Sequence, residues 1–183
     1  MKKLLILLII PLLFSCKKNS NKAKPVEEKK VLIDELINKG DWDIRDSQMG
    51  DYGSGPSSRI PIAYYESELF SGIAFDIEDG EIIIEGRFKN GKKEGLWYYN
   101  WNIVGHTVSY KNGQIHGSWN NYNDAFRGKD SLKVYVSSPV RNLGFLIGKL
   151  MYNNGEFLGG ISYLPNGEKT TCFDNRMQKI TCE

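Results

Sequence analysis

The chain has 183 residues, with 24 Lys and Arg against 22 Asp and Glu and a formal net charge of +2. Lys2 and Lys3 lie in the first 15 residues, so the remaining chain has 24 − 2 = 22 basic residues against 22 acidic ones. Nucleic-acid binding needs clustered positive charge, and the only dense basic run covers residues 17–24. We therefore expect no nucleic-acid partner.

Residues 1–15 have the organisation of a secretory signal peptide. A basic start precedes an apolar run from Leu4 to Phe14, which is shorter than a typical membrane span. Residues 13–16, LFSC, resemble the bacterial lipobox, in which a diacylglycerol is attached to the cysteine thiol and cleavage leaves that cysteine as the N-terminus. We therefore expect Cys16 to be lipidated and to anchor the chain to a membrane of the bacterial envelope, on the periplasmic side or at the cell surface. An ordinary signal peptide that is cleaved elsewhere is the weaker alternative.

The next segments predict a tether, a helix and a loop. Residues 16–30 are rich in charge and poor in apolar side chains, which predicts a disordered tether. Residues 31–40, VLIDELINKG, have apolar side chains at helical spacing and Gly40 to end the helix, so we expect one short helix here. Residues 41–61 contain many Gly, Ser and Pro and predict a surface loop. That loop could be a binding lid, but a plain insertion is the simpler interpretation.

From residue 62 onward, short β-prone runs alternate with turn signals. An Asn-Gly pair between such runs is the strongest local signal for a β-hairpin, because both central residues of a type I′ turn need a positive φ. The spacings between the turn glycines, 11, 22, 42 and 12 residues, fit a unit of about 22 residues if a degenerate unit occupies residues 124–146, where residues 132–136 still predict a strand. The five turn signals are Asp79-Gly80, Asn90-Gly91, Asn112-Gly113, Asn154-Gly155 and Asn166-Gly167.

We therefore predict an all-β fold in which residues 62–183 form an elongated antiparallel sheet of repeated β-hairpins. In each clear copy an aromatic residue lies three positions before the turn glycine, a second glycine lies four positions after it, and a large side chain follows two positions later. These positions are filled by Phe88, Gly95 and Trp97, by Tyr110, Gly117 and Trp119, and by Tyr152, Gly159 and Ile161.

The second glycine of each copy is expected to allow close approach of neighbouring groups. A two-residue hairpin at Asn90-Gly91 places Gly95 opposite Gly86, which leaves a gap that an aromatic ring can cover. The cross-strand pairs predicted from this register are Arg87 with Glu94, Ile84 with Trp97, and Lys89 with Lys92.

The template of an aromatic residue, x-Asn-Gly, a second Gly and Trp resembles the MORN repeat (membrane occupation and recognition nexus), in the variant of the bacterial YwqK-family antitoxins. The resemblance covers roughly residues 64–168, and residues 69–75, LFSGIAF, are similar to the Phe-Thr-Gly segment that opens the array in those chains. It implies a curved sheet of hairpins that each contact their neighbours. Eukaryotic relatives are linked to membranes, dimerisation and scaffolding, so we expect an envelope lipoprotein that acts as a protein-binding or scaffolding module, with an antitoxin or immunity role as one specific form.

Two cysteines remain once Cys16 is assigned to the lipid. Cys172 and Cys182 form an even pair in an exported chain, so we expect a disulfide in an oxidising compartment. Zinc is the weaker alternative, because it needs two more ligands and His106 and His116 lie far away in the sequence.

The residues that could carry chemistry form no convincing catalytic set, so we expect neither an enzyme nor a cofactor. The acidic run at residues 76–81 suggests calcium through Asp76, Glu78, Asp79 and Glu81, but the alternation of a strand and the turn at Asp79 favour no metal site.

The remaining candidate is a row of aromatic residues. Trp97, Tyr99 and Trp101 alternate along one strand and therefore project from one face, with Trp119 nearby in the next hairpin and Tyr98 on the other side. Structural filling is the favoured interpretation. Any of these rings left exposed would form a binding face for a protein or, in the alternative function, for glycans or lipid head groups.

Overall fold

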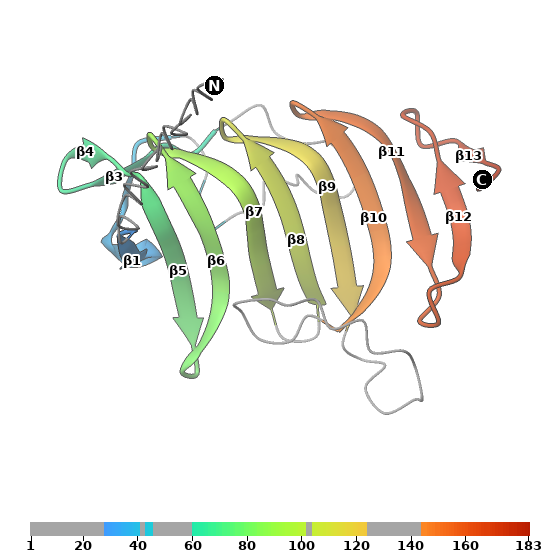
Figure 1. Ribbon diagram of the computed structural model, residues 1–183, viewed down its shortest axis with the longest axis horizontal. Helices are drawn as coiled ribbons and strands as arrows, with labels where there is room; N and C mark the ends of the chain where they lie inside the picture. Colours follow the sequence, from blue (N-terminus) through green and yellow to red (C-terminus); the bar gives the residue numbers. More distant parts are fainter. Residues whose placement is uncertain (1–27, 41–42, 46–59, 102–103, 124–143) are drawn as a thin grey trace, which may run out of the picture.

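A computed structural model describes residues 28–40, 43–45, 60–101, 104–123 and 144–183. These residues form a long ten-stranded sheet in which the chain runs from one edge to the other (Figure 1). β1 pairs with β5 in parallel, and every later strand pairs antiparallel with the one before it. The strands of this sheet are β1 (Lys30–Leu32), β5 (Gly72–Glu78), β6 (Glu81–Lys89), β7 (Lys92–Trp101), β8 (Val104–Lys111), β9 (Gln114–Asn123), β10 (Phe145–Asn153), β11 (Glu156–Tyr163), β12 (Lys169–Phe173) and β13 (Lys179–Ile180). The predicted all-β sheet of antiparallel hairpins is confirmed.

A small second sheet lies beside the end of the large sheet that β1 and β5 form (Figure 1). It consists of β2 (Ile37–Asn38), β3 (Ala63–Tyr65) and β4 (Glu68–Leu69). The two sheets are joined at a hairpin tip, where the amide of Ala63 donates to the carbonyl of Gly91 at 2.8 Å and the amide of Gly91 donates to the carbonyl of Phe70 at 2.7 Å. Both backbone groups of Gly91 are therefore satisfied, one by β3 and the other by Phe70, the residue that follows β4.

The helix predicted over residues 31–40 is confined to a single 3₁₀ turn, η1 (Ile33–Glu35), which is flanked by β1 and β2. Val31 pairs with Ala74 in the large sheet and is 4% exposed, so strand pairing and burial override a helical pattern too short to be stable alone. β1 begins at Lys30, the last residue of the predicted tether, and pairs with β5 of the large sheet. The signal segment, most of the tether, residues 46–59 of the predicted loop and residues 124–143 lie outside the described residues.

Four of the five predicted turns have left-handed residues at both central positions, as type I′ requires. At the β6–β7 turn, φ is 49° for Asn90 and 75° for Gly91. The Asn166-Gly167 turn differs, because Gly167 alone has a positive φ and its amide donates to the carbonyl of Leu164 at 2.8 Å, three residues back. The other type I′ pairs are Asp79-Gly80, Asn112-Gly113 and Asn154-Gly155.

The second glycine of each repeat marks a β-bulge. Three residues of β7, from Gly95 to Trp97, lie against the single residue Gly86 of β6. Gly95 has a φ of 69°, and a Cβ built on it would meet nothing within 4 Å, so backbone conformation and not close approach explains this glycine. Registers also shift in the two later hairpins, where Gly117 and Gly159 have φ values of 93° and 146°.

The bulge corrects one of the predicted cross-strand pairs. Ile84 lies opposite Tyr99 instead of Trp97, because the extra residues of β7 move the register. The pairs on the turn side of the bulge, Arg87 with Glu94 and Lys89 with Lys92, are confirmed.

Gly86, on the other strand, does provide the predicted gap. A Cβ built on Gly86 would lie 2.0 Å from Cδ2 of Trp97, so the indole ring occupies the space of the missing side chain. The ring is fully buried, and its Nε1 donates to the carbonyl of Arg87 at 3.0 Å. Phe88 meets the same indole edge to face, with ring centroids 5.0 Å apart.

The main core lies on the face of the large sheet from which Trp97 projects. It fills the space between the strands and the segment that carries η1 and the small sheet. Its buried residues are Val31, Ile33, Leu36, Ile44, Ala63, Phe70, Ala74, Ile83, Ile84, Phe88, Trp97, Tyr99, Val108, Tyr110, Ile115, Trp119 and Tyr152. No helix within the described ranges is long and apolar enough to cross a membrane.

Cys172 of β12 and Cys182 form the predicted disulfide, with their Cα atoms 5.3 Å apart. In the chain-entropy picture, closing a loop of this size contributes about 2–3 kcal/mol to stability. Both sulfurs are occupied, so the pair provides no thiolates for zinc.

We expect Gly86→Ala to lower the free energy of unfolding by about 1–3 kcal/mol, because the added methyl group overpacks against a buried indole. The matched control is Gly148→Ala, where a Cβ would make only ordinary contact, 3.4 Å from Nδ2 of Asn121, at an ordinary φ. That variant should cost less than about 0.5 kcal/mol. Urea denaturation measures both, and equal losses would contradict the proposed packing role of Gly86.

Candidate functional site

The register of the strands sorts the side chains into two faces. On the core face, Ile84, Tyr99, His106 and Asn121 follow one another from β6 to β9. On the other face, which we call the opposite face, a row of paired residues crosses the sheet from β6 to β10. It consists of Glu85, Tyr98, Thr107, Asn120 and Lys149.

The aromatic row predicted from the sequence is structural. Trp97 and Tyr99 are 0% exposed and Trp119 is 1% exposed, so none of the three can contact a ligand on the surface. Their rings join the core, with Trp97 stacked on Tyr99 at a centroid distance of 6.0 Å. Trp101 ends β7, but its side chain lies outside those that the structure describes. The predicted binding face, and the glycan or head-group alternative built on it, therefore loses its three described residues.

A lysine lies among these buried rings. Lys93 follows the β6–β7 turn on the core face and is 0% exposed. Its Nζ donates to the hydroxyl of Tyr99 at 3.0 Å, and that hydroxyl lies 3.2 Å from the hydroxyl of Tyr110. The ammonium also lies 4.5 Å from the centre of the Trp97 ring and 5.2 Å from that of Tyr110. Hydrogen bonding and cation–π contacts thus replace part of the hydration that the charge loses on burial.

The second polar group on the core face is built around His106. Nδ1 of His106 donates to Oδ1 of Asn121 at 2.7 Å, and Nε1 of Trp119 donates to the same oxygen at 2.8 Å. An amide oxygen can only accept, so the proton of the neutral imidazole is on Nδ1. Burial lowers the pKa of His106 below its ordinary value, although the hydrogen bond to Asn121 opposes this effect. His106 therefore acts as a neutral, structural hydrogen-bond donor.

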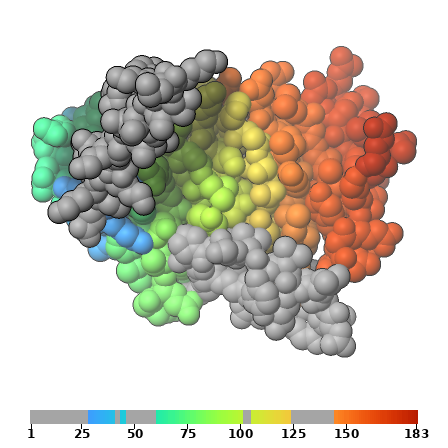
Figure 2. All heavy atoms as spheres, in the orientation of Figure 1, coloured from blue at the N-terminus to red at the C-terminus, as the bar shows by residue number. Residues whose placement is uncertain are grey.

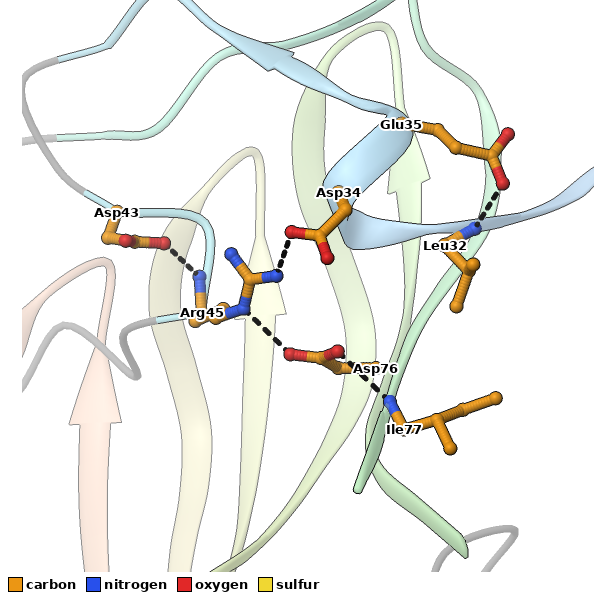
Figure 3. A network of polar contacts seen from close by, with 7 residues as sticks. All are labelled: Leu32, Asp34, Glu35, Asp43, Arg45, Asp76 and Ile77. Atoms are coloured by element: carbon orange, nitrogen blue, oxygen red, sulfur yellow. Dashed lines mark hydrogen bonds and ion pairs between the residues drawn. The ribbon is translucent and has the colours of Figure 1, made fainter. Parts of the chain in front are cut away.

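Asp76, the first residue of the predicted acidic run, belongs to an ion-pair network around Arg45. Arg45 points between Asp34 of η1 and Asp76 of β5, with an ion pair to each (Figure 3). The distance from its Nε to Asp76 Oδ2 is 2.7 Å, and the other oxygen of Asp76 accepts from the amide of Ile77 at 3.0 Å. Asp43 Oδ1 accepts from the amide of Arg45 at 2.8 Å. This network ties the N-terminal segment to the sheet.

The structure also bears on the calcium alternative for the predicted acidic run. Within the described ranges, no group of three or more His, Cys, Asp or Glu side chains is arranged to hold a metal ion. Glu78 pairs with Glu81 across the hairpin ladder, with Asp79 in the turn between them.

The opposite face carries the exposed apolar surface that the aromatic-row prediction did not consider. Leu96 is 42% exposed, and beside it Tyr98 is half-buried. Together with Ile73 they border a shallow hollow of about 150 Å³, whose charged rim contains Glu85 and Arg87. We call these five residues the Leu96 patch.

The rim charges of the Leu96 patch are paired. Lys30 of β1 contacts Glu85 at 2.5 Å, and Glu28 contacts Arg87 at 2.6 Å. Paired charges thus surround an apolar centre, which is how core and rim are organised at protein interfaces.

A polar cluster continues this face toward β9. Nδ2 of Asn120 donates to Oγ1 of Thr107 at 2.9 Å, and the hydroxyl of Tyr122 lies 3.4 Å from the same oxygen. Tyr98 and Leu146 pack against Tyr122, and burial raises the pKa of the Tyr122 hydroxyl. The sequence signal for this face was strand alternation, which places Leu96 and Tyr98 opposite Trp97 and Tyr99.

We expect Tyr99→Phe to lower the free energy of unfolding by about 1–3 kcal/mol, because the buried ammonium of Lys93 loses a hydrogen-bond acceptor. Tyr98→Phe is the matched control, since it makes the same change one residue away on the opposite face and should cost less than about 0.5 kcal/mol. Urea denaturation compares the two. If Tyr99→Phe is as stable as the control, the hydroxyl does not help to hold Lys93.

The lowered pKa of His106 predicts that stability falls as the pH drops. Well above pH 6.5, the ordinary pKa of histidine, the imidazole is neutral in both folded and unfolded chains. Below that value the unfolded chain binds the proton first, so the free energy of unfolding decreases by up to about 1.4 kcal/mol per pH unit. Denaturation between pH 7.5 and 5 measures the slope, which should be smaller in His106→Gln. An unchanged slope in that variant would contradict the assignment.

No family model matches the chain, and neither a curated protein nor a solved structure shows significant similarity to it. The resemblance to MORN repeats stays a prediction, and the function is argued from the geometry of the sheet.

Proposed function

We propose that this chain is a protein-binding module that is anchored to a membrane of the bacterial envelope and binds its partner through the Leu96 patch. The observation that carries the proposal is the exposure of Leu96 at 42% on a sheet whose other face is filled by its own core. A large apolar side chain beside a half-buried tyrosine is typical of the centre of an interface.

The sheet beneath the patch supports a preformed surface. Tyr98 pairs with Glu85 on one side and with Thr107 on the other, and its neighbour Trp97 is buried in the core. Binding to such a surface needs little ordering of the backbone, which reduces the entropic cost of association. The ion pairs at Glu85 and Arg87 add charges of both signs around the centre, which favours one orientation of the partner.

The lipid anchor at Cys16 belongs to the same proposal and rests on the sequence of residues 13–16. An acylated Cys16 would hold the sheet at a membrane. Confinement to the membrane surface would raise the effective concentration of a partner on the same membrane. An immunity-like role would be one form of this function, and it requires that loss of the gene expose the cell to a specific toxin.

The test is a cross-linking pull-down of the tagged full-length lipoprotein from membranes. We expect Leu96→Asp combined with Tyr98→Ala to reduce partner recovery at least about tenfold, because it places a charge at the apolar centre of the interface. Cys16→Ser should release the protein from the membrane fraction. Ile37→Ser, which changes a residue of the small sheet that is 54% exposed, is the matched control and should recover the partner normally.

Equal recovery by the wild type, the double variant and the Ile37→Ser control would contradict the Leu96 patch as the binding site. Membrane retention of Cys16→Ser would contradict the anchor without affecting the result for the patch.

A further inference from the structure

A groove of about 700 Å³ lies at the C-terminal end of the sheet, between β10, β13 and the residues that follow. The register of the strands places Lys149, Ile161, Cys172 and Ile180 side by side across it. This row continues the opposite face, on which Lys149 pairs with Asn120. In Figures 1 and 2 the groove-forming strands, orange to red, occupy the end of the molecule away from β1.

The groove combines apolar side chains with two lysines, Lys149 and Lys169, and with one acidic residue, Glu183, at its C-terminal rim. Met151, Ile161 and Ile180 contribute apolar surface, and Met151 and Ile180 are 36% and 52% exposed. Lys149 lines the same groove and is half-buried. In the described part of the chain, no acidic side chain forms an ion pair with Lys149. A partly desolvated ammonium beside apolar surface favours an anion as its partner.

The rim of the groove is held in place by covalent and polar links. The disulfide joins Cys172 in the sheet to Cys182, and Nζ of Lys169 donates to the backbone carbonyl of Glu183. Both links hold the last residues beside the groove, so that its shape exists before a ligand arrives.

We propose that this groove binds a single-chain amphiphilic anion, with its carboxylate or phosphate on Lys149 and its alkyl chain along Met151, Ile161 and Ile180. The volume lies within the range of small-molecule sites, about 300–1,000 Å³. An added peptide strand fits less well, because β13 already covers the edge of β12 at Cys172 and Phe173. The groove shares no residue with the Leu96 patch, so either proposal can fail without the other.

The experiment uses the full chain with Cys16→Ser, so that its own acyl group does not compete, labelled with ¹³C at the methionine methyl groups. Laurate and dodecyl phosphate, below their micelle concentrations, should shift the Met151 resonance. Met177, which is 63% exposed in a turn outside the groove, is the internal control and should not move. The affinity for uncharged dodecyl maltoside should be at least about tenfold lower than for the two anions, since this detergent lacks the charge-assisted contact.

Variants of Lys149 test the role of the charge. Lys149→Gln should weaken binding of both anions by about 10–100-fold, as expected for loss of a charge-assisted hydrogen bond. Lys149→Arg should retain binding, and Lys111→Gln, which removes an exposed lysine from another hairpin, should behave as the wild type.

Four results would overturn the proposal. They are equal binding of dodecyl maltoside, unchanged anion binding by Lys149→Gln, association with anionic vesicles without a shift of Met151, and a shift caused by an acidic apolar peptide but not by the amphiphiles. The vesicle result would indicate general surface adsorption, and the peptide result would indicate a protein partner.

Discussion

The contact between the Trp97 indole and Gly86 is the constraint on which the rest of the sheet depends. The ring fills the space of a side chain that Gly86 lacks, and it can do so only because the bulge at Gly95 adds residues to β7 before Trp97. Without that bulge Trp97 would lie opposite Ile84 and away from the gap. Once the ring is in place, it provides the surface against which Phe88 packs edge to face and over which the ammonium of Lys93 lies.

Much of this arrangement could be predicted from local signals. A type I′ turn needs two left-handed residues, so Asn90-Gly91 specifies its hairpin almost alone, and the first pairs beyond it follow from counting. The bulge could not be predicted by counting residues from the turn. A glycine at position 95 is compatible either with close approach of a neighbouring group or with a left-handed backbone, and only the pairing with β6 shows which one applies. The helix predicted over residues 31–40 failed for a similar reason. Val31 gains more from pairing with Ala74 than a ten-residue helix could provide by itself.

The location of the candidate site depends on which face of the sheet the rest of the chain covers, and strand alternation does not show this. Residues 96–99 show which side chains share a face, but not which face the rest of the chain covers. The segment that carries η1 and the small sheet packs on the Trp97 side, held there by Arg45 between Asp34 and Asp76 (Figure 3). As a result Trp97 and Tyr99 are part of the core, while Leu96 is exposed and Tyr98 is half-buried on the opposite face. The local sequence around Trp97 does not show that the segment from η1 to Arg45 packs on the face of the sheet from which Trp97 projects.

The two proposed sites lie on one continuous row of paired residues on the opposite face. The row passes from Glu85 and Tyr98 through Thr107 and Asn120 to Lys149. β1, which follows the predicted tether, lies at the end nearer the Leu96 patch, and the groove lies at the other (Figure 1). In a meander of this kind each strand contacts only its neighbours, so a change at one site reaches the other only through every ladder between them. Binding at Lys149 and binding at Leu96 should therefore be thermodynamically independent. A ligand in the groove would add a second contact without changing the affinity of the Leu96 patch for its partner.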